Sequence, residues 1–496
     1  MSRKLISILF FITTLSVNSQ SLVLSTNMQD AYQAAISLNE TEMWVYIKAE
    51  QKEQPDNLFP LIVENYLDFF KAFILEEKVY NVNLQNKKNN QTSQIEKIDP
   101  NNPLKLWALA SIYLHSAASR SKFDEQYSAA LEVRKAYLLL EENKKRFPDF
   151  LPNNISLGLL YAIIGSVPPQ YQWIVKLASM EGDVKEGRKL LYAALHPTEP
   201  DFYSRIMRAE VLFYLSFIEM NLNPDKKLSL KLLQDYTSED ILNPLLLYSK
   251  VSIEMRSGLN ESALRTLKKR TKTSTAFPLY YLDYLEAEAK LRKLDTSAAI
   301  NYHYFLDNYR GLNYKADAKR KLAWIAILKS DTTAYLITLQ QITSMEAGQV
   351  EADKQALREA GNKEIPLKDL LMARLRFDGG YYDKSREMLF RASKSFQQMS
   401  MNQRLEYNYR MGRVYHALEN YPEALNYYKK TWTDGSDSPL YYAANSALLA
   451  GEINELAKKT DEAIRLFKLC LSIQPEEYRL GIHAKAKAGL NRLKTK

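Results

Sequence analysis

The sequence predicts an all-α protein built as a solenoid of repeated helix-turn-helix units. Glycine is scarce, at 15 of 496 residues, while leucine, alanine, lysine and glutamate are abundant, a composition typical of helices. No stretch alternates apolar and polar residues over several positions with β-branched enrichment, as a half-buried strand would. Small residues recur at nearly regular intervals in the second half of the chain, which indicates a repeated unit.

The repeat is clearest over residues 405–477. Aligning Gly412 with Gly451 places Tyr428 over Phe467. This pattern resembles the tetratricopeptide repeat (TPR), a helix pair of about 34 residues. The resemblance implies a right-handed TPR superhelix, in which a small residue stands where two helices cross and a ring fills the gap to the next unit. It identifies a scaffold and leaves open what the scaffold binds.

The same small position can be followed through the array. The intervals between successive members are 36, 35, 51, 39 and 39 residues, and the members are Ala263, Ala299, Ala334, Ser385, Ala424 and Ala463. The long interval contains MEAGQVEADKQALREAGNKEIP, which predicts one inserted or lengthened helix. We therefore expect at least six repeats in a TPR array over residues 201–477. A polar capping helix, Tyr478–Leu493, is expected within residues 478–496, because a solenoid must cover its last face.

Residues 20–200 predict a helical region with degenerate repeats. The segment 84–103 is polar and rich in asparagine, so we expect an exposed loop there. Proline and glycine punctuate the helices on either side of this loop. The predicted helices are Asp30–Glu50, Leu58–Tyr80, Leu104–Ala118 and Phe123–Phe147.

Residues 156–195 depart from the plain repeat. Pro168 and Pro169 break one helix, Gly182 and Asp183 form a turn before the next, and Trp173 lies between them. Similar "G…PP…GD…G…LL" stretches occur in TPR proteins of the yeast inclusion-body-clearance type and in exported TPR proteins of Bacteroidetes. The resemblance spans about 40 residues and implies a TPR protein of an exported Bacteroidetes type.

The N-terminus, residues 1–19, resembles a secretory signal peptide. Arg3 and Lys4 are followed by the apolar run Leu5–Leu15 and by small residues, so cleavage after Ser19 would leave Gln20 first. The alternative is a membrane anchor, but the run is short for a span of about 20 residues. We expect a periplasmic protein without a transmembrane span in the mature chain, with peripheral association with the envelope as an option.

Composition argues against several classes of function. The net charge of +9 falls to +7 without the signal peptide, which is small for this length, and the expected export disfavours nucleic-acid binding. The single cysteine, Cys470, excludes an internal disulfide. The five histidines lack metal-ligand spacing, and no HExxH, phosphate-loop or GxSxG motif occurs. We expect no catalytic residue, metal or cofactor.

The first helix of each repeat lines the groove of a TPR array, and its positions 2, 5, 9, 12 and 13 face that groove. Counting these positions in three repeats predicts aromatic rings beside guanidinium groups, and arginine can bind a carboxylate through paired hydrogen bonds. We expect Arg374 and Arg413 to lie side by side. The alternative is that these residues pair within the array. The predicted binding residues are Tyr281, Tyr284, Arg374, Tyr409, Arg413 and His416.

These observations predict a non-catalytic scaffold or adaptor that binds a protein or peptide segment. Two other classes remain open. One is a glycan-binding protein like the SusD family, which is also TPR-based and rich in aromatic residues. The other is an enzyme, which would need a compact inserted domain that the sequence does not contain.

Overall fold

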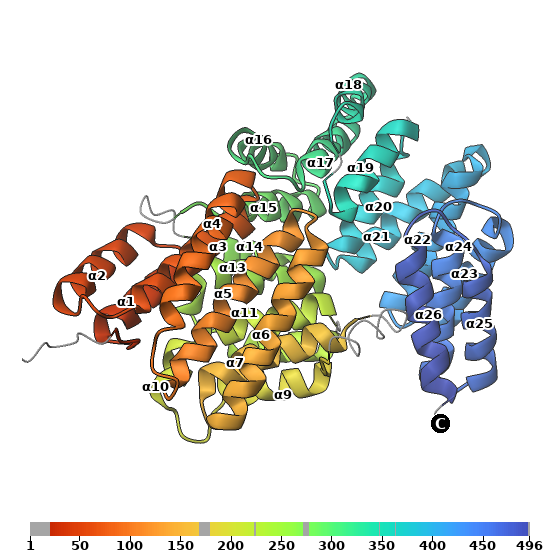
Figure 1. The fold of residues 1–496 in the computed structure, drawn as a ribbon. Coiled ribbons are helices and arrows are strands. Elements are labelled where there is room, and N and C mark those ends of the chain that lie inside the picture. The colour runs from red at the N-terminus through yellow and green to blue at the C-terminus, as the bar shows by residue number, and fades with distance from the viewer. Residues whose placement is uncertain are drawn as a thin grey trace, which may run out of the picture. The chain divides into compact units, whose positions relative to one another are not determined.

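The computed structural model describes residues 20–167, 179–222, 225–270, 277–346, 348–362 and 364–494. Within these ranges the chain forms helices and no strand, apart from one isolated bridge between Ser21 and Asn57. Successive helices pack as pairs joined by short turns (Figure 1). The predicted all-α solenoid is therefore confirmed. The predicted signal peptide, and Pro168, Pro169 and Trp173, lie outside the described residues.

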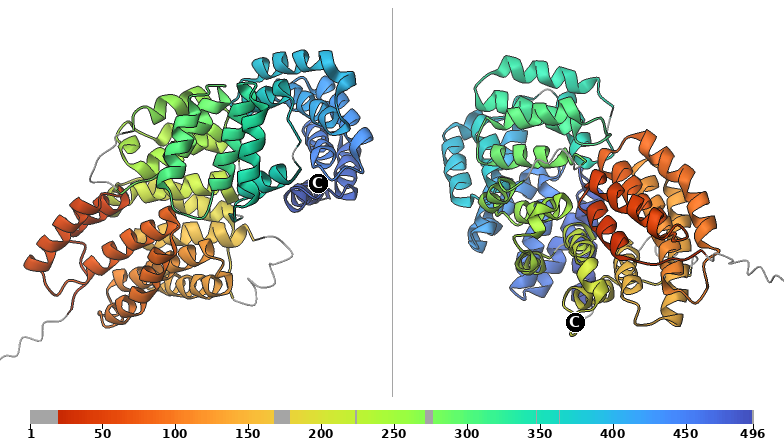
Figure 2. Two further views of the ribbon diagram at one scale, coloured as in Figure 1. Left: turned by 90° about the horizontal axis from the view of Figure 1, so that it is seen from above. Right: turned by 90° about the vertical axis from the view of Figure 1, so that its left-hand side faces the viewer.

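The chain divides into two compact units, and Figure 2 shows the helices of each from two further directions. Unit 1 comprises the described residues within Met1–Ile218 and Lys272–Pro278, and unit 2 those within Glu219–Thr271 and Leu279–Lys496. Neither unit has a helix, among the residues described, that is long and apolar enough to cross a membrane. The helices of unit 1 are α1 (Thr26–Ile36), α2 (Glu40–Glu53), α3 (Phe59–Leu75), α4 (Lys78–Ile95), α5 (Pro103–Lys122), α6 (Gln126–Arg146), α7 (Leu151–Gly165), α9 (Val184–Leu195), α10 (Phe202–Ile206) and α11 (Arg208–Phe217).

The predicted loop over residues 84–103 is wrong, because helix α4 occupies most of it. Leu84 and Ile95 of α4 are fully buried, and α4 packs against α3 and α5. Between these two apolar contacts the helix is held by polar groups: Asn65 Nδ2 donates to the buried Gln91 Oε1 at 2.9 Å. Buried amides that satisfy one another can replace apolar burial, and composition alone does not reveal such pairing.

Glycines set the close approach of α7 and α9. A Cβ atom on Gly187 would stand 2.3 Å from the carbonyl oxygen of Gly158, so the two backbones touch. The side chain of Asp183 accepts hydrogen bonds from the first turn of α9 and begins that helix, as the sequence predicted. The glycines of the atypical stretch therefore have a packing role.

The core of unit 1 contains a buried histidine. His115 of α5 is 6% exposed, its Nδ1 lies 2.8 Å from Asn65 Oδ1, and its ring stacks on Phe69 with centroids 4.4 Å apart. Burial lowers the pKa of His115 to about 3. The imidazole is therefore neutral in the folded chain at neutral pH.

Unit 2 contains the regular repeats. The helix pairs are α13/α14, α15/α16, α17/α18, α20/α21, α22/α23 and α24/α25, with α19 inserted in the long interval and α26 closing the array, as the sequence predicted. The helices are α12 (Lys226–Leu232), α13 (Pro244–Arg256), α14 (Asn260–Leu267), α15 (Tyr281–Arg292), α16 (Ala298–Asn308), α17 (Lys315–Leu328), α18 (Thr332–Thr343), α19 (Glu351–Asn362), α20 (Lys368–Asp378), α21 (Tyr382–Ala392), α22 (Met401–Ala417), α23 (Tyr421–Gly435), α24 (Tyr442–Leu456), α25 (Thr460–Ser472) and α26 (Arg479–Lys494).

Glycine and an aromatic ring meet at the helix crossings of the last two repeats. A Cβ atom on Gly412 would stand 2.6 Å from Tyr428 Cδ1, and one on Gly451 would stand 2.6 Å from Phe467 Cε1. Only glycine therefore lets the first helix rest on the ring of the second. Cys470 is fully buried one turn further along α25, and burial raises the pKa of its thiol to about 12.

Candidate functional site

The predicted binding residues lie on three first helices of unit 2. Tyr281 and Tyr284 are on α15, Arg374 is on α20, and the other three are on α22. These helices belong to the predicted TPR array, in which the first helix of each repeat lines the groove. The structure gives the residues different environments, which separates those that can meet a partner from those that hold the array together.

Arg413 lies against two aromatic rings. Its guanidinium is 4.5 Å from the ring centroid of Phe377 on α20, and its Nη1 donates to Tyr409 OH at 2.9 Å. Asn445 Nδ2 of α24 donates to the same phenol oxygen at 2.7 Å, which fixes the Tyr409 ring. Arg413 is half-buried and forms no ion pair with the described residues.

Arg374 has a matching arrangement one repeat earlier. Its guanidinium is 4.6 Å from the ring centroid of Trp324 on α17. Glu359 and Asp378 attract it electrostatically, yet within the described ranges Arg374 forms neither a hydrogen bond nor an ion pair. The sequence predicted that Arg374 and Arg413 would lie side by side; in the structure each guanidinium lies on an aromatic ring, Arg374 on Trp324 and Arg413 on Phe377.

Trp324 is the centre of a cationic cluster. The sequence did not predict this cluster. Besides Arg374, its ring meets Arg320 at 4.9 Å and Lys321 at 4.4 Å, and its Nε1 donates to Glu359 Oε1 at 2.7 Å. The groove-facing positions were assigned on α15, α20 and α22, and α17 was not among these helices. Two basic residues beside a tryptophan on that helix were the signal that could have found the cluster.

A row of aromatic rings extends from Tyr409 of α22 to α24. The ring of Tyr409 meets Tyr441 edge-to-face at 5.5 Å and Tyr442 at 5.0 Å, and Tyr441 meets Tyr478 before α26 at 5.1 Å. Tyr409 is 1% exposed, so the predicted binding residue lies in the interior, where its ring and hydroxyl position Arg413. These ring pairs join α22 to α24 and to the segment before α26.

Of the two tyrosines of α15, Tyr284 belongs to the interior and Tyr281 is half-buried. Tyr284 is 5% exposed and its hydroxyl donates to Asp317, while Tyr281 stacks on Tyr284 with centroids 5.1 Å apart. Tyr281 also meets Tyr314 at 4.5 Å. Both rings link neighbouring repeats, and the burial of Tyr284 places it outside the surface offered to a partner.

His416 is a neutral, half-buried side chain. Burial and the neighbouring Arg413 lower its pKa to about 4, and its Nδ1 lies 3.2 Å from Tyr428 OH. At neutral pH it carries no charge with which to attract a carboxylate. Its contribution is limited to hydrogen bonding and to packing at the crossing of α22 and α23.

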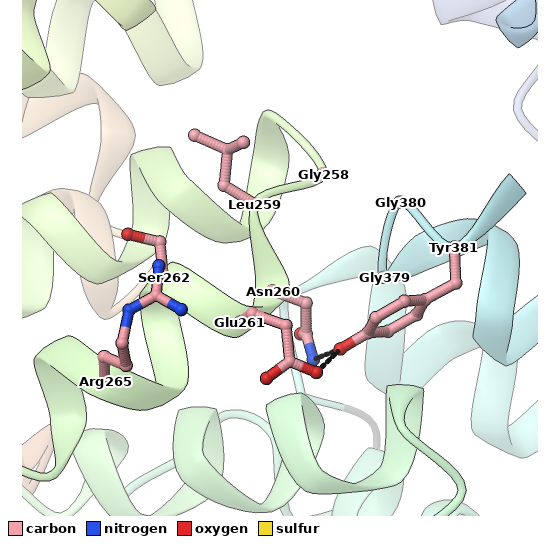
Figure 3. Close-up of a pocket in the computed structure, with 9 residues that line it drawn as sticks. All are labelled: Gly258, Leu259, Asn260, Glu261, Ser262, Arg265, Gly379, Gly380 and Tyr381. Carbon is pink, nitrogen blue, oxygen red and sulfur yellow. Dashed lines mark hydrogen bonds between the residues drawn. The ribbon is translucent and has the colours of Figure 1, made fainter.

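A pocket of about 220 Å³ lies elsewhere in unit 2, between the turns that precede α14 and α21 (Figure 3). Gly258 and Gly380 have φ of +79° and +80°, and a Cβ atom on Gly380 would stand 2.0 Å from the Gly258 carbonyl oxygen. The two turns therefore meet backbone to backbone, 122 residues apart in sequence. The lining residues are Gly258, Leu259, Asn260, Glu261, Ser262, Arg265, Gly379, Gly380 and Tyr381.

Side chains of this pocket bond to one another. Tyr381 OH donates to Glu261 Oε1 at 2.8 Å and accepts from Asn260 Nδ2 at 3.1 Å (Figure 3). Lys293 forms an ion pair with Glu261 at 3.0 Å, and the hydrogen bonds from Lys293 and Tyr381 lower the pKa of Glu261. We interpret these contacts as a structural clasp between the α13/α14 and α20/α21 turns.

Comparisons with known proteins do not identify a function for this surface. No protein-family model and no curated protein matches the chain. Among solved structures, the chain is similar to the crystal structure of the P58(IPK) TPR domain, at 13% identity over 86% of this chain and 100% of that chain, with a TM-score of 0.23. Because that score is low, the TPR-like assignment rests on the helix pairs and crossings of this chain.

Proposed function

We propose that the protein is a non-catalytic scaffold whose unit 2 binds an acidic segment of a partner protein. The observation that carries this proposal is that Arg374 and Arg413 each lie on an aromatic ring without a carboxylate partner among the described residues. Guanidinium groups held in this way present a planar edge of N–H donors, which suits paired hydrogen bonds to a carboxylate.

Neighbouring arginines show the contrast. Arg320 is paired with Asp317, and Arg410 is paired with Glu406, so their charges are balanced within the array. Arg374 and Arg413 are the cations of this surface that lack such a pair among the residues described. A partner that supplies carboxylates would complete the pairing, and each hydrogen bond to a charged group contributes about 1.5–3 kcal/mol before ordering costs.

We propose further that this binding occurs in the periplasm. The support is the basic start, apolar run and small residues of positions 1–19. Partners would then be envelope proteins with exposed acidic segments.

The experiment is affinity capture from an envelope extract of the native host, with the tagged full-length protein as bait and quantitative mass spectrometry as the readout. The test variant is Arg374→Ala with Arg413→Ala. We expect it to lose a partner that the wild type retains, and we expect that partner's acidic segment to bind the wild type as a purified peptide. The binding should weaken as salt concentration rises.

The matched control is Arg386→Ala with Arg465→Ala. It removes the same charge from the second helices α21 and α25, where the arginines pair with Asp383 and Glu462. The control should retain the partner. Equal loss in both double variants, or a large fall in melting temperature only in the test variant, would contradict the proposal.

A further inference from the structure

The inserted helix α19 meets the cationic cluster directly. It packs against α17 and α18, the pair that carries Trp324 and Arg320. Glu359 of α19 accepts from Trp324 Nε1 at 2.7 Å, and its other oxygen lies 3.7 Å from Arg320 Nη1. The chain thus places one carboxylate of its own beside Trp324, the ring on which Arg374 lies.

A second carboxylate fixes the other end of α19. Asp353 Oδ2 accepts from the Tyr314 backbone N–H at 2.6 Å, and its Oδ1 accepts from the Asp317 backbone N–H at 2.9 Å. Asp353 is 1% exposed, so these donors are fully enclosed while α19 is docked. Burial raises the pKa of this carboxyl, and the two hydrogen bonds oppose that effect.

Apolar burial contributes little to holding α19. Its only fully buried apolar side chains are Ala356 and Ala360, whereas α17 buries a tryptophan and two isoleucines. Hydrophobic stabilisation scales with the apolar area removed from water, and two methyl groups remove little. A helix held mainly by charged and polar contacts is released more readily than the repeats on which it packs.

Two further polar contacts join α19 to the segment before α26. Gln355 Nε2 donates to Glu477 Oε1 at 3.1 Å, and Arg358 Nε lies 3.9 Å from the same oxygen, in the segment before α26. Seven residues separate α18 from α19, and five separate α19 from α20, so the insert has a tether at each end. Release of α19 would leave α17 and α18 paired with each other.

We propose that α19 is a resident competitor for the binding surface, and that the partner segment is an acidic helix of the same kind. Such a helix carries two carboxylates six residues apart, one for the backbone donors at Tyr314 and Asp317 and one for Trp324 and Arg320, with alanine-sized residues between them. This inference rests on the proposed function and states which segment of a partner binds and what it displaces.

The test is hydrogen exchange on the full-length protein, in the absence and presence of a peptide with the sequence of residues 348–362. Without peptide, we expect the amides of α19 to exchange at least about tenfold faster than those of α17 and α20. Millimolar peptide should accelerate α19 exchange further, because the peptide takes the docking site, while protection of α17 and α18 is kept.

The matched control is the same peptide with Asp353→Asn and Glu359→Gln, which keeps length and helix propensity and removes both carboxylates. It should leave the exchange of α19 unchanged. Exchange of α19 as slow as that of α17, or equal effects of the two peptides, would overturn the inference.

These outcomes are distinguishable from failure of the proposed function. If α19 stays protected while the Arg374→Ala, Arg413→Ala variant still loses its partner, the scaffold function stands and the competitor role falls. If the acidic peptide displaces α19 but that variant keeps every partner, the surface exchanges helices without binding at the two arginines, and the proposed function falls.

Discussion

The guanidinium of Arg374 lies 4.6 Å from the ring centroid of Trp324, although 50 residues separate them in the sequence. The contact connects α20 to α17, and the inserted helix α19 lies between these two helices in the sequence. It fixes the plane of an arginine that lacks a carboxylate partner in the described chain. A cation over an indole contributes about 0.5–2 kcal/mol, depending on how far the pair is desolvated.

We therefore predict measurable coupling between Arg374 and Trp324. Urea unfolding of Arg374→Ala, Trp324→Leu and the double variant should give a coupling free energy of about 0.5–2 kcal/mol. Additive effects within about 0.3 kcal/mol would mean that the two side chains contribute independently.

Gly412 should tolerate no side chain. Gly412→Ala places a methyl group 2.6 Å from Tyr428 Cδ1, and such overpacking should lower the free energy of unfolding by about 1–3 kcal/mol. The matched variant is Gly481→Ala in α26, where a Cβ atom would meet nothing within 4 Å. That variant should be neutral or slightly more stable, because alanine favours helix. Similar thermal melts for the two variants would contradict the assigned crossing.

The stability of the clasp should fall when a methyl group is added at Gly380 and when the hydroxyl of Tyr381 is removed. Gly380→Ala introduces a clash with the Gly258 carbonyl at a positive φ, so we expect a loss of more than about 1 kcal/mol in unfolding free energy. Tyr381→Phe should cost about 1 kcal/mol, because Glu261 and Asn260 each lose a hydrogen-bond partner. Unfolding curves that match wild type for both variants would show that the turns do not need this contact.

The buried His115 should make stability depend on pH. Its pKa is about 3 in the folded chain and 6.5 in the unfolded chain, so between these values the unfolded state binds the extra proton. The free energy of unfolding should therefore fall as pH drops from about 6.5 toward 3, by at most about 1.4 kcal/mol per pH unit for this group. His115→Gln should show a shallower fall in urea titrations at pH 4–7. Parallel curves would assign the dependence to other groups.

Export has a direct test at the N-terminus. If residues 1–19 are removed as a signal peptide, N-terminal sequencing of protein from its native host should begin at or near Gln20. Protein that mostly retains Met1 would exclude cleavage. A fusion of residues 1–19 to a reporter that is active only in the periplasm gives an independent measurement.

The repeats could be predicted from the sequence because their crossings depend on single small residues. Gly412 and Gly451 recur at a fixed interval, and each must be small since a ring lies directly against it. The inserted helix was predictable for the same reason, as a break in that interval. A helix crossing that needs a small residue can be recognised in the sequence, because the small residue recurs at the same position of each repeat.

Contacts that depend on tertiary packing could not be predicted. Helix α4 looked like a loop because its stability comes from partners such as Asn65 on α3, which bonds to Gln91. The meeting of Gly258 with Gly380 joins turns 122 residues apart, and no spacing rule relates them. The sequence predicted Arg374 beside Arg413 but did not predict the aromatic ring on which each guanidinium lies, because Trp324 and Phe377 belong to other helices.

The buried thiol of Cys470 makes the protein convenient for site-directed labelling. With a pKa of about 12, this thiol is almost entirely protonated at neutral pH, and protonated thiols react slowly with maleimides. A cysteine introduced at the exposed position Lys354 of α19 would therefore be the main reactive site without removal of the native one. A fluorescent dye or spin label placed there would report the mobility of the inserted helix in an otherwise unaltered chain.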